Sequence, residues 1–309
     1  MKKIVVIGSL NMDMVINLTR TPQKGETVLT ERLELVCGGK GANQAYAMAR
    51  LGGEVTMLGA VGQDASGQAL CENLQKSGVC TDHLMRLEGV STGTAVVMVS
   101  EDGDNSIVVV SGANSHVDRA YIDSKLDCIK ACDIVVMQLE IPLDTVVYAA
   151  RLAKSLGKLV VLDPAPARND LPDELLACVD LLKPNETELQ ILLGGSEEDF
   201  DLAAARLQER GVQNVLITLG AQGIFVKEQQ GKSSHLAAIP VKAVDTTAAG
   251  DSFIAGVTVG LARGQSLLQA VHFANYAASI VVTRKGAQSS IPHLCEVQEA
   301  MGQECERLA

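Results

Sequence analysis

Short apolar runs alternate with helix-like segments through the second half of the chain, and this alternation constrains the fold more than any other feature. Strands are expected over residues 134–137, 159–162, 181–183 and 215–218. Segments with helical signals separate each of these strands from the next. Because buried strands joined by helices run parallel, the pattern predicts a three-layer α/β/α fold around a mostly parallel sheet. We expect a single domain over residues 1–309, since no linker or internal repeat interrupts the chain.

The N-terminal part follows a different pattern. Polar and apolar residues alternate over 11–18 and 27–36, which is typical of strands exposed on one face. Residues 94–100 and 107–110 are expected to pair across a Glu-Asp-Gly-Asp-Asn turn at 101–105. These segments predict a small β-sheet, with strands within 11–36 and 94–112, that forms a lid on the main body.

The remaining segments predict further elements around this frame. Additional strands are expected over 4–7, 55–61 and 239–244, and an antiparallel pair over 224–226 and 235–239. Helices are expected over 64–77, 118–130, 248–262, 267–283 and 295–307.

The composition excludes several classes of function. A formal net charge of −11 argues against a surface for nucleic acid or anionic membranes. The eight cysteines form no C-x-x-C pair, so we expect reduced thiols in a cytoplasmic protein rather than disulfides or zinc ligands. No signal peptide or membrane span is expected.

Polar residues follow the expected strands at their carboxyl ends, which is where ligands bind in sheets of this kind. The residues concerned are Asn11, Asp13, Gln138, Glu140, Asp163, Asn185, Glu186, Glu188, Gly220, Gly223 and the segment 245–251. We therefore expect one site at this edge of the sheet.

The segment 245–251 reads Asp-Thr-Thr-Ala-Ala-Gly-Asp and opens a helix near Ala248. A helix start carries unpaired N–H groups and the positive end of the dipole, which suits an anion such as phosphate. Ala248, Ala249 and Gly250 leave the backbone accessible. Asp251 either caps the helix or accepts a proton during phosphoryl transfer, and the segment alone does not separate the two.

Four other groups also allow two interpretations each. The glycine-rich segment 38–43 is a flexible turn or an anion cradle, and it matches neither phosphate-loop fingerprint. Asn11 and Asp13 form a turn-and-cap pair or bind sugar hydroxyls. In the segment 185–188, Asn185 caps the start of a helix, or the acidic pair Glu186 and Glu188 holds water on Mg²⁺. The segment 218–223 is a tight hairpin or approaches a nucleotide.

Two motifs carry a resemblance to a known family. They are Gly38-Gly-Lys-Gly-Ala-Asn-Gln44 and Val244-Asp-Thr-Thr-Ala-Ala-Gly-Asp-Ser-Phe253. Supporting matches occur at 8–13, 137–140, 164–168, 183–188 and 283–290, in the expected order along nearly the whole chain. The sequence resembles the ribokinase family, the PfkB-type carbohydrate kinases.

The resemblance implies a ribokinase-like fold and ATP-dependent phosphorylation of the 5-hydroxyl of D-ribose, giving D-ribose 5-phosphate and ADP. Asp251 is implied as the base, and residues 248–251 as the anion hole. The sugar would be held by Asn11, Asp13, Gly39, Lys40, Gly41, Ala42, Asn43, Glu140 and Asp251. ATP would be held by Asn185, Thr218, Leu219, Gly220, Ala221, Gln222, Gly223, Gly250, Asp251 and Asn275.

The resemblance also implies metal ions and a partner. A potassium site would be formed by Asp245, Thr247, Val281, Arg284, Gly286 and Ser290, several of them through backbone carbonyls. Glu188, together with Asn185, would be linked to Mg²⁺. A homodimer is implied in which the small lids clasp each other.

Two positions depart from the family pattern, and rival functions remain. Asp163 stands where asparagine is expected, and Asn275 stands where histidine is expected. The rival enzyme phosphorylates another sugar, such as 2-deoxyribose, or a nucleoside. The rival without catalysis is a regulator that binds a sugar or nucleotide. Retention of Asn11 and Asp13 favours ribose over 2-deoxyribose, because polar groups would otherwise be left unmatched.

Overall fold

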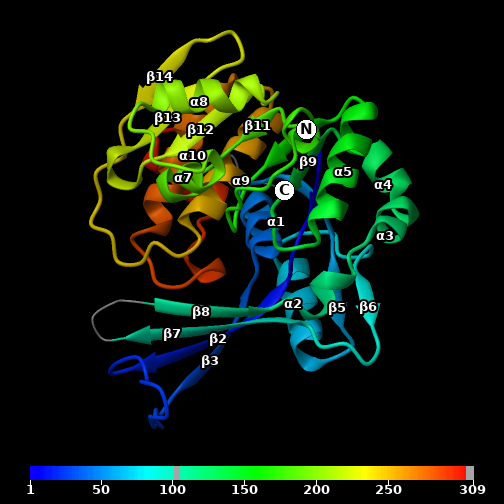
Figure 1. Ribbon diagram of the computed structural model, residues 1–309, viewed down its shortest axis with the longest axis vertical. Coiled ribbons are helices and arrows are strands. Elements are labelled where there is room, and N and C mark those ends of the chain that lie inside the picture. The colour runs from blue at the N-terminus through cyan, green and yellow to red at the C-terminus, as the bar shows by residue number, and fades with distance from the viewer. Residues whose placement is uncertain (101–104, 304–309) are drawn as a thin grey trace.

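A computed structural model describes residues 1–100 and 105–303 of the chain. Its main body is built on an eight-stranded sheet with the strand order β14-β13-β12-β11-β10-β9-β1-β4 (Figure 1). The six strands from β12 to β4 are parallel, and β13 and β14 are antiparallel. The strands are β1 Lys3–Ile7, β4 Glu54–Leu58, β9 Ile134–Met137, β10 Leu159–Leu162, β11 Leu181–Leu182, β12 Asn214–Thr218, β13 Ile224–Lys227 and β14 Ser233–Leu236.

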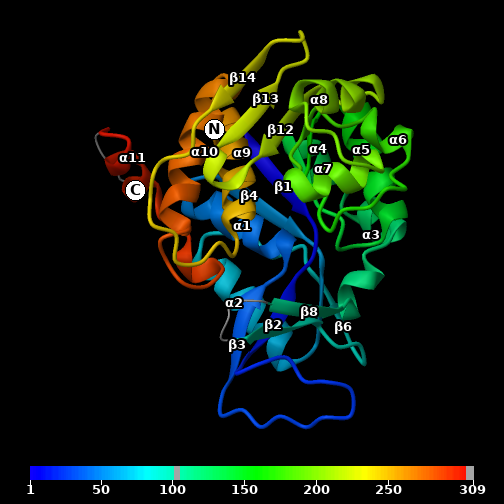
Figure 2. The ribbon, with the colours of Figure 1, turned by 60° about the vertical axis from the view of Figure 1, so that its left-hand side comes forward.

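Helices cover both faces of this sheet, which confirms the predicted three layers (Figure 2). Ile4 and Val6 of β1 pack into the core on one face, and Val5 and Ile7 pack into the core on the other. The first face is covered by α1 Lys40–Arg50, α2 Ala65–Lys76, α9 Ala249–Ala262, α10 Leu267–Val281 and α11 Leu294–Ala300. The second is covered by α3 Arg119–Ser124, α4 Leu126–Ala131, α5 Leu143–Ser155, α6 Asp173–Leu176, α7 Glu186–Leu193 and α8 Phe200–Glu209.

A four-stranded sheet stands off the main body, as the alternating segments predicted (Figure 1). Its order is β3-β2-β7-β8, from β2 Asn11–Leu18, β3 Leu33–Gly38, β7 Gly93–Ser100 and β8 Asn105–Val110. We call it the small sheet. Leu35, Met14, Val96 and Val108 are paired across it in one row, so they share one face. A separate two-stranded sheet pairs β5 Ala60–Gly62 with β6 Met85–Leu87.

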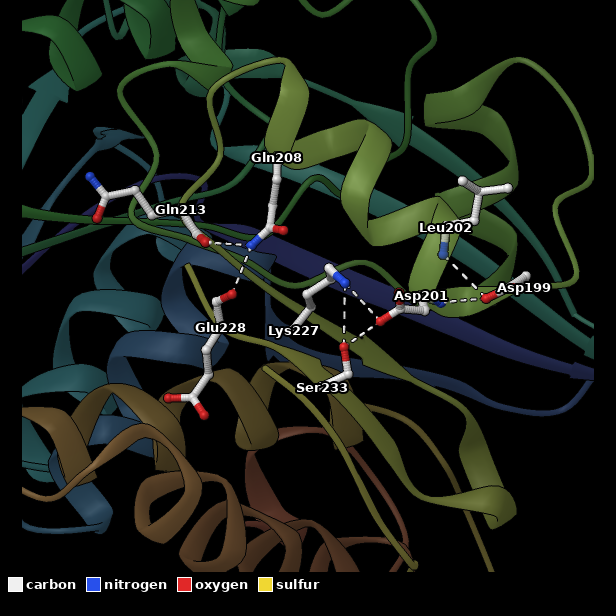
Figure 3. Close-up of polar contacts among 8 residues, drawn as sticks. All are labelled: Asp199, Asp201, Leu202, Gln208, Gln213, Lys227, Glu228 and Ser233. Carbon is white, nitrogen blue, oxygen red and sulfur yellow. Dashed lines mark hydrogen bonds and ion pairs between the residues drawn. The ribbon is translucent and has the colours of Figure 1, made fainter. Parts of the chain in front are cut away.

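The antiparallel edge of the main sheet is fixed to α8 by polar contacts (Figure 3). Lys227 is 7% exposed, and its Nζ lies 2.7 Å from Asp201 Oδ1 and donates to Ser233 Oγ at 3.4 Å. Gln208 Nε2 donates to the carbonyls of Gln213 and Glu228 at 2.8 and 3.1 Å. Helix α8, β13 and β14 are therefore held together as one unit beside the strands that form the site.

Several expected boundaries are wrong. Residues 237–248 form no strand, and the side chains of Val241 and Val244 are exposed, so the apolar run at 239–244 is not part of the sheet. The strand expected over 27–36 begins only at Leu33, and the one expected over 55–61 is divided at Gly59. The helix expected over 118–130 is divided at Lys125. These errors share a cause: an apolar pattern does not show where the backbone turns.

The ends of two expected elements lie outside the described residues. Helix α11 ends at Ala300, and the rest of the expected 295–307 helix includes residues beyond 303. Residues 101–104 of the expected hairpin turn also lie outside, although their flanking strands β7 and β8 are paired as predicted.

The cysteines are only partly as expected. Free thiols are found at Cys37, Cys71, Cys80, Cys128, Cys132 and Cys178. Cys295 in α11 is disulfide-bonded, so the expectation of reduced thiols throughout is wrong at this position. Among the described residues, no helix is long and apolar enough to cross a membrane.

Candidate active site

A cleft of about 790 Å³ opens where β11 and β12 end and where α9 begins. This is the edge of the sheet at which the sequence predicted a ligand site. The expected site residues that line it are Lys40, Asp163, Asn185, Glu186, Glu188, Thr218, Gly220, Ala221, Gly223, Thr246, Ala248, Ala249, Gly250, Asp251 and Asn275. Leu219 and Gln222 do not line it: Leu219 is buried in the core, and Gln222 is exposed on a short 3-10 turn, Gly220–Gln222.

Asp251 lies at the base of this cleft and is 7% exposed. Asn43 Nδ2 donates to its Oδ2 at 3.1 Å, and Gln44 Nε2 donates to its Oδ1 at 3.0 Å. Burial raises the pKa of Asp251, and the Asp163 carboxylate adds to this, while Lys40 and the two amides oppose it. Burial therefore makes this carboxylate a better proton acceptor than a solvent-exposed aspartate.

The start of α9 has an unusual backbone. Ala248, the residue before the helix, has φ +59°, and among the described residues it alone has positive φ without being glycine. A non-glycine residue in this region costs on the order of 1 kcal/mol or more, and such strain collects at functional sites. Ala249 and Gly250 follow, and Gly250 lines the cleft. The first turn of α9 thus presents its backbone to the cleft beside Asp251.

A buried ion pair faces this helix start, and sequence reasoning did not single out its cation. Lys183 Nζ lies 3.0 Å from Asp163 Oδ1, and the two side chains are 4% and 1% exposed. A Cβ atom on Gly250 would lie 3.3 Å from the same Nζ. Lys183 follows β11 directly, so its position at the end of a strand was the available signal. Asp163, which stands where the family pattern has asparagine, is therefore the ion-pair partner of a lysine that lines the cleft.

Gln44 joins this pair to Asp251. Its Nε2 donates to Asp163 Oδ2 at 2.8 Å as well as to Asp251, and its Oε1 accepts from Gln138 Nε2 at 2.5 Å. Gln44 and Gln138 are fully buried. The two carboxylates are therefore held at fixed positions by one amide group.

A second group of polar residues lies where the small sheet meets α1. Glu140 Oε2 accepts from Ser9 Oγ at 2.5 Å and from the backbone N–H of Lys40 at 3.0 Å. Asp13 has a pKa raised to about 7 by burial and by the charges of Glu140 and Asp251. The structure therefore brings Asp13, Glu140 and Asp251 close enough to interact electrostatically.

Lys40 supplies positive charge between these carboxylates. Burial acts to lower its pKa, but the nearby carboxylates of Asp251, Asp163 and Glu140 outweigh it, so the pKa is raised. The lysine stays protonated, which offsets part of the negative charge of the site.

The glycine-rich segment is packed tightly against the residues before β2. Gly39 has φ +89°, and a Cβ there would lie 2.6 Å from the backbone nitrogen of Asn11. The Ala42 N–H donates to the Ser9 carbonyl at 2.9 Å. A Cβ on Gly41 would likewise lie 2.6 Å from the Ser9 nitrogen. These glycines allow α1 to begin beside β2, which argues against a flexible turn.

Asn11 is buried and is bonded to a residue that the sequence gave no reason to select. Its Oδ1 accepts from Asn114 Nδ2 at 2.7 Å, and Asn114 Oδ1 accepts from the Leu10 N–H at 2.9 Å. Asn114 therefore fixes the side chain of Asn11 at the start of the small sheet.

On the far side of the cleft, Asn185 and Glu188 form a capping box at the start of α7. Asn185 Oδ1 accepts from the Glu188 N–H, and Glu188 Oε2 accepts from the Asn185 N–H, both at 2.8 Å. This is the capping interpretation of the pair, and both residues also line the cleft. Among the described residues there is no group of three or more His, Cys, Asp or Glu side chains that could hold a metal ion.

Asn275 connects α10 to the segment that borders the cleft. It is 7% exposed, and its Nδ2 donates to the Ala237 carbonyl at 2.8 Å. Residues 238–241 and 243 of that segment line the cleft.

Behind the start of α9, Asp245 ties two loops together. Its Oδ1 accepts from the N–H and hydroxyl of Thr247 at 2.9 and 2.6 Å, and its Oδ2 accepts from the Gly286 N–H at 2.8 Å. Burial acts to raise the pKa of Asp245, but these donors outweigh it and lower the pKa. Ser290 and Val281 lie buried near the ends of the second loop, and Arg284 pairs with Glu296 at 2.6 Å.

Comparison with known proteins gives a consistent result. The family model for pfkB family carbohydrate kinases matches residues 1–294. The ribokinase of Haemophilus influenzae is 42% identical over 301 residues, covering 96% of this chain and 98% of its own. The deoxyribokinase of Salmonella typhi is 36% identical over 299 residues, covering 96% and 97%. A solved structure of Arabidopsis thaliana ribokinase complexed with ribose and ATP superposes with a TM-score of 0.91 at 37% identity, covering 96% and 98%.

The fold and these comparisons define a sugar kinase, which is a phosphotransferase with an alcohol group as acceptor. The chain belongs to the pfkB family of carbohydrate kinases, as the two motifs indicated.

Proposed function

We propose that the chain catalyses ATP-dependent phosphorylation of D-ribose at its 5-hydroxyl, giving D-ribose 5-phosphate and ADP. The observation that carries the proposal is the position of Asp251. It is buried at the start of α9, it accepts a hydrogen bond from the side-chain amide of Asn43 in the glycine-rich segment, and it lines the cleft together with Lys183. The resemblance to the Haemophilus influenzae ribokinase supports the choice of sugar.

The sugar lies, in this proposal, between the small sheet and α1. Asn11, Asp13, Asn43 and Glu140 offer carboxylate and amide groups to its hydroxyls, and the backbone of Gly39 to Ala42 passes close to them. Buried polar groups of this kind discriminate by being left unpaired when a hydroxyl is absent. The small sheet would cover the sugar and exclude water, which limits ATP hydrolysis.

Transfer then requires little more than alignment and charge neutralisation. The 5-hydroxyl oxygen attacks the γ-phosphorus, its proton passes to an Asp251 carboxylate oxygen, and the bond from the γ-phosphorus to the bridging oxygen breaks to release ADP. The backbone N–H groups at 248–251 and the Lys183 ammonium face the developing negative charge.

ATP occupies the larger part of the cleft in this proposal. Its phosphates point to Gly250 and Asn185, and its adenine and ribose lie along Thr218, Gly220, Gly223 and Asn275. Ala221 belongs to the same lining, whereas Leu219 and Gln222 lie outside it and close the loop through backbone bonds from Leu219 N–H to the Gly223 carbonyl and from Gln222 N–H to the Leu219 carbonyl. Thr218 and Asn185 are paired in an isolated bridge, so the two ends of this surface are fixed to each other.

The residues present fit the two metal ions that the family implies. Glu188 lines the cleft together with Glu186, and a carboxylate there would suit Mg²⁺, which keeps several waters and would be held otherwise by phosphate oxygens. Mg²⁺ supplies neutralisation of phosphate charge when bound. Asp245 stays ionised, and with Thr247 and Gly286 it joins the loops that would hold K⁺, together with Val281, Arg284 and Ser290.

We also propose a homodimer formed through the small sheets. Support comes from the apolar side chains of Leu33, Leu35, Val108 and Val110, which are 57%, 60%, 56% and 52% exposed. Light scattering that gives the mass of a single chain at micromolar concentration would contradict this. A cytoplasmic location is proposed too, supported by the free thiols at six positions.

The direct test is ADP release with ribose and ATP, measured with and without potassium. We expect ribose-dependent ADP that increases when potassium is added. Absence of ribose-dependent ADP would contradict the proposed function. A panel including 2-deoxyribose and nucleosides tests the second candidate, which the 36% identity to a deoxyribokinase favours. Binding of sugar and ATP without turnover would instead indicate a regulator.

A further inference from the structure

A chain of side-chain amides runs from Asp251 to the loop that follows α10. Asn43 Nδ2 donates to Asp251 Oδ2 at 3.1 Å, and Asn43 Oδ1 accepts from Gln288 Nε2 at 3.0 Å. Gln288 Oε1 in turn accepts from Asn73 Nδ2 in α2. Asn43 and Gln288 are 7% and 5% exposed, so water competes little for these bonds.

The direction of these bonds decides how Asn43 faces the base. An asparagine amide has an acceptor oxygen and a donor nitrogen, and rotation by half a turn exchanges them. Gln288 donates to the oxygen, so the nitrogen must point to Asp251. In the opposite orientation, the Asn43 oxygen would face the Asp251 carboxylate, and two acceptors would oppose each other.

Asn73 fixes Gln288 in the same way. Because its Nδ2 donates to Gln288 Oε1, the Nε2 of Gln288 is directed to Asn43. Each side-chain amide thus orients the next one, and this chain of hydrogen bonds ends at Asp251. The helices α1, α2 and α9 all contribute to this chain, although their residues lie far apart in the sequence.

Gln288 also belongs to the loop that is bonded to Asp245. Gly286 N–H donates to Asp245 Oδ2 at 2.8 Å, and Gln288 begins a short 3-10 turn, Gln288–Ser290, two residues later. The same loop therefore contacts the segment behind the start of α9 and the amide beside the base.

We propose that Gln288 is a positioning residue: it orients Asn43 toward Asp251 and couples the 284–290 loop to the base. This rests on the proposed function of Asp251. Gln288 itself reaches neither sugar nor nucleotide in this scheme, and it acts only through Asn43.

The test is a double-mutant cycle with Gln288→Met and Asn43→Ala. The kcat of each variant is measured with whichever sugar the unmodified chain phosphorylates fastest. Methionine keeps the length of glutamine but neither donates nor accepts strongly. We expect Gln288→Met to lower kcat about tenfold, with the KM for ATP unchanged, because its effect falls on the base. In the Asn43→Ala background it should cause little further loss.

Gln75→Met is the control for the glutamine-to-methionine change itself, because Gln75 is an exposed glutamine of α2 with one side-chain bond, to Thr81 Oγ1 at 2.8 Å. It should leave kcat unchanged. Gln288→Met should also reduce the fold-activation by potassium, whereas Gln75→Met should not. Thermal melting of each variant shows whether a loss of kcat comes from unfolding.

Two outcomes would overturn the inference: an unchanged kcat in Gln288→Met, or a full tenfold loss that persists in the Asn43→Ala background. Failure of the proposed function is seen separately, as absence of sugar-dependent ADP in the unmodified chain. In that event, the proposed orientation of Asn43 by Gln288 can still be tested from the side-chain amide signals in a ¹H–¹⁵N NMR spectrum. Gln288→Met should shift and broaden the Asn43 side-chain amide signal, and an unchanged signal contradicts it.

Discussion

Two strands with almost the same sequence have opposite environments in this molecule. Residues 134–137 of β9 read Ile-Val-Val-Met, and residues 107–110 of β8 read Ile-Val-Val-Val. The side chains of β9 are at most 1% exposed, whereas those of β8 are 48% to 56% exposed. β9 lies in the middle of the main sheet between β1 and β10, and β8 is the edge of the small sheet.

This difference in exposure indicates different roles for the main sheet and the small sheet. The main sheet has a helix layer on each face, so the groups at its strand ends are held in place before any ligand arrives. The small sheet lacks a complete cover, and its apolar side chains remain available for a partner or for closure over a ligand. The proposed base and the proposed phosphate-facing groups come from the first region, and Asn11 and Asp13 come from the second.

The largest expected effect tests whether the chemistry belongs to the main body. Asp251→Asn removes the proton acceptor and should lower kcat by about 10³-fold, while ATP binding is retained. Steady-state turnover measures kcat, and an ATP titration measures the affinity for ATP. Asp170→Asn, an exposed carboxylate paired with Arg168, is the control and should be neutral. Near-normal turnover of Asp251→Asn would remove the residue from its role.

Lys183→Met tests the phosphate-facing side of the same region. We expect kcat to fall about 10²-fold, because a positive charge beside the transferring phosphoryl group is lost. The variant also leaves Asp163 buried without its partner, which destabilises the fold by several kcal/mol. Adding Asp163→Asn should restore the melting temperature but not kcat. Recovery of both would mean that Lys183 has a structural role only.

The two similar strands can be compared directly by an isosteric change. Val135→Thr places a hydroxyl in the core between main sheet and helices and should cost about 1–3 kcal/mol of unfolding free energy. Val109→Thr, on the half-exposed β8, should change it by less than about 0.5 kcal/mol. Urea unfolding measures both. Equal losses would show that β8 is as well covered as β9 in solution.

A pH-dependent effect is expected at Asp13, where the small sheet meets the main body. Its pKa is raised to about 7 in the folded chain, so the folded state binds a proton that the unfolded state has released above pH 4. Stability from this group is therefore lost as pH rises from about 4 to about 7. Asp13→Asn should melt increasingly above the unmodified chain across that range, and a pH-independent difference would contradict it.

Much of the fold follows from local patterns. The apolar runs at β9 and β10 are short and flanked by helical segments, so their place in a parallel sheet was predictable. The segment 239–244 is also largely apolar but lies outside the sheet, whose edge on that side is formed by β13 and β14. Hydrophobic periodicity indicates which secondary structure a segment prefers. It does not indicate whether a place in the sheet is available to that segment.

The candidate site shows the same division. Asp251 and the glycine-rich segment were found from their motifs, because a helix start and tight backbone turns have local signatures. Lys183, Gln44 and Gln288 were not found. Each is one polar residue whose partners lie far away in sequence, such as Gln288 and Asn43 at a separation of 245 residues.

The sequence by itself determined the layered fold, the two motifs and the acid at the start of α9, because these depend on spacing over a few residues. Only the tertiary structure decided that β9 is buried while β8 is exposed. It also decided that Asp251 lies near the charge of Lys40, shares Gln44 with the Lys183–Asp163 ion pair, and stands at the end of a chain of oriented amides. Burial and hydrogen-bond direction depend on which distant segments meet, and no local pattern carries that information.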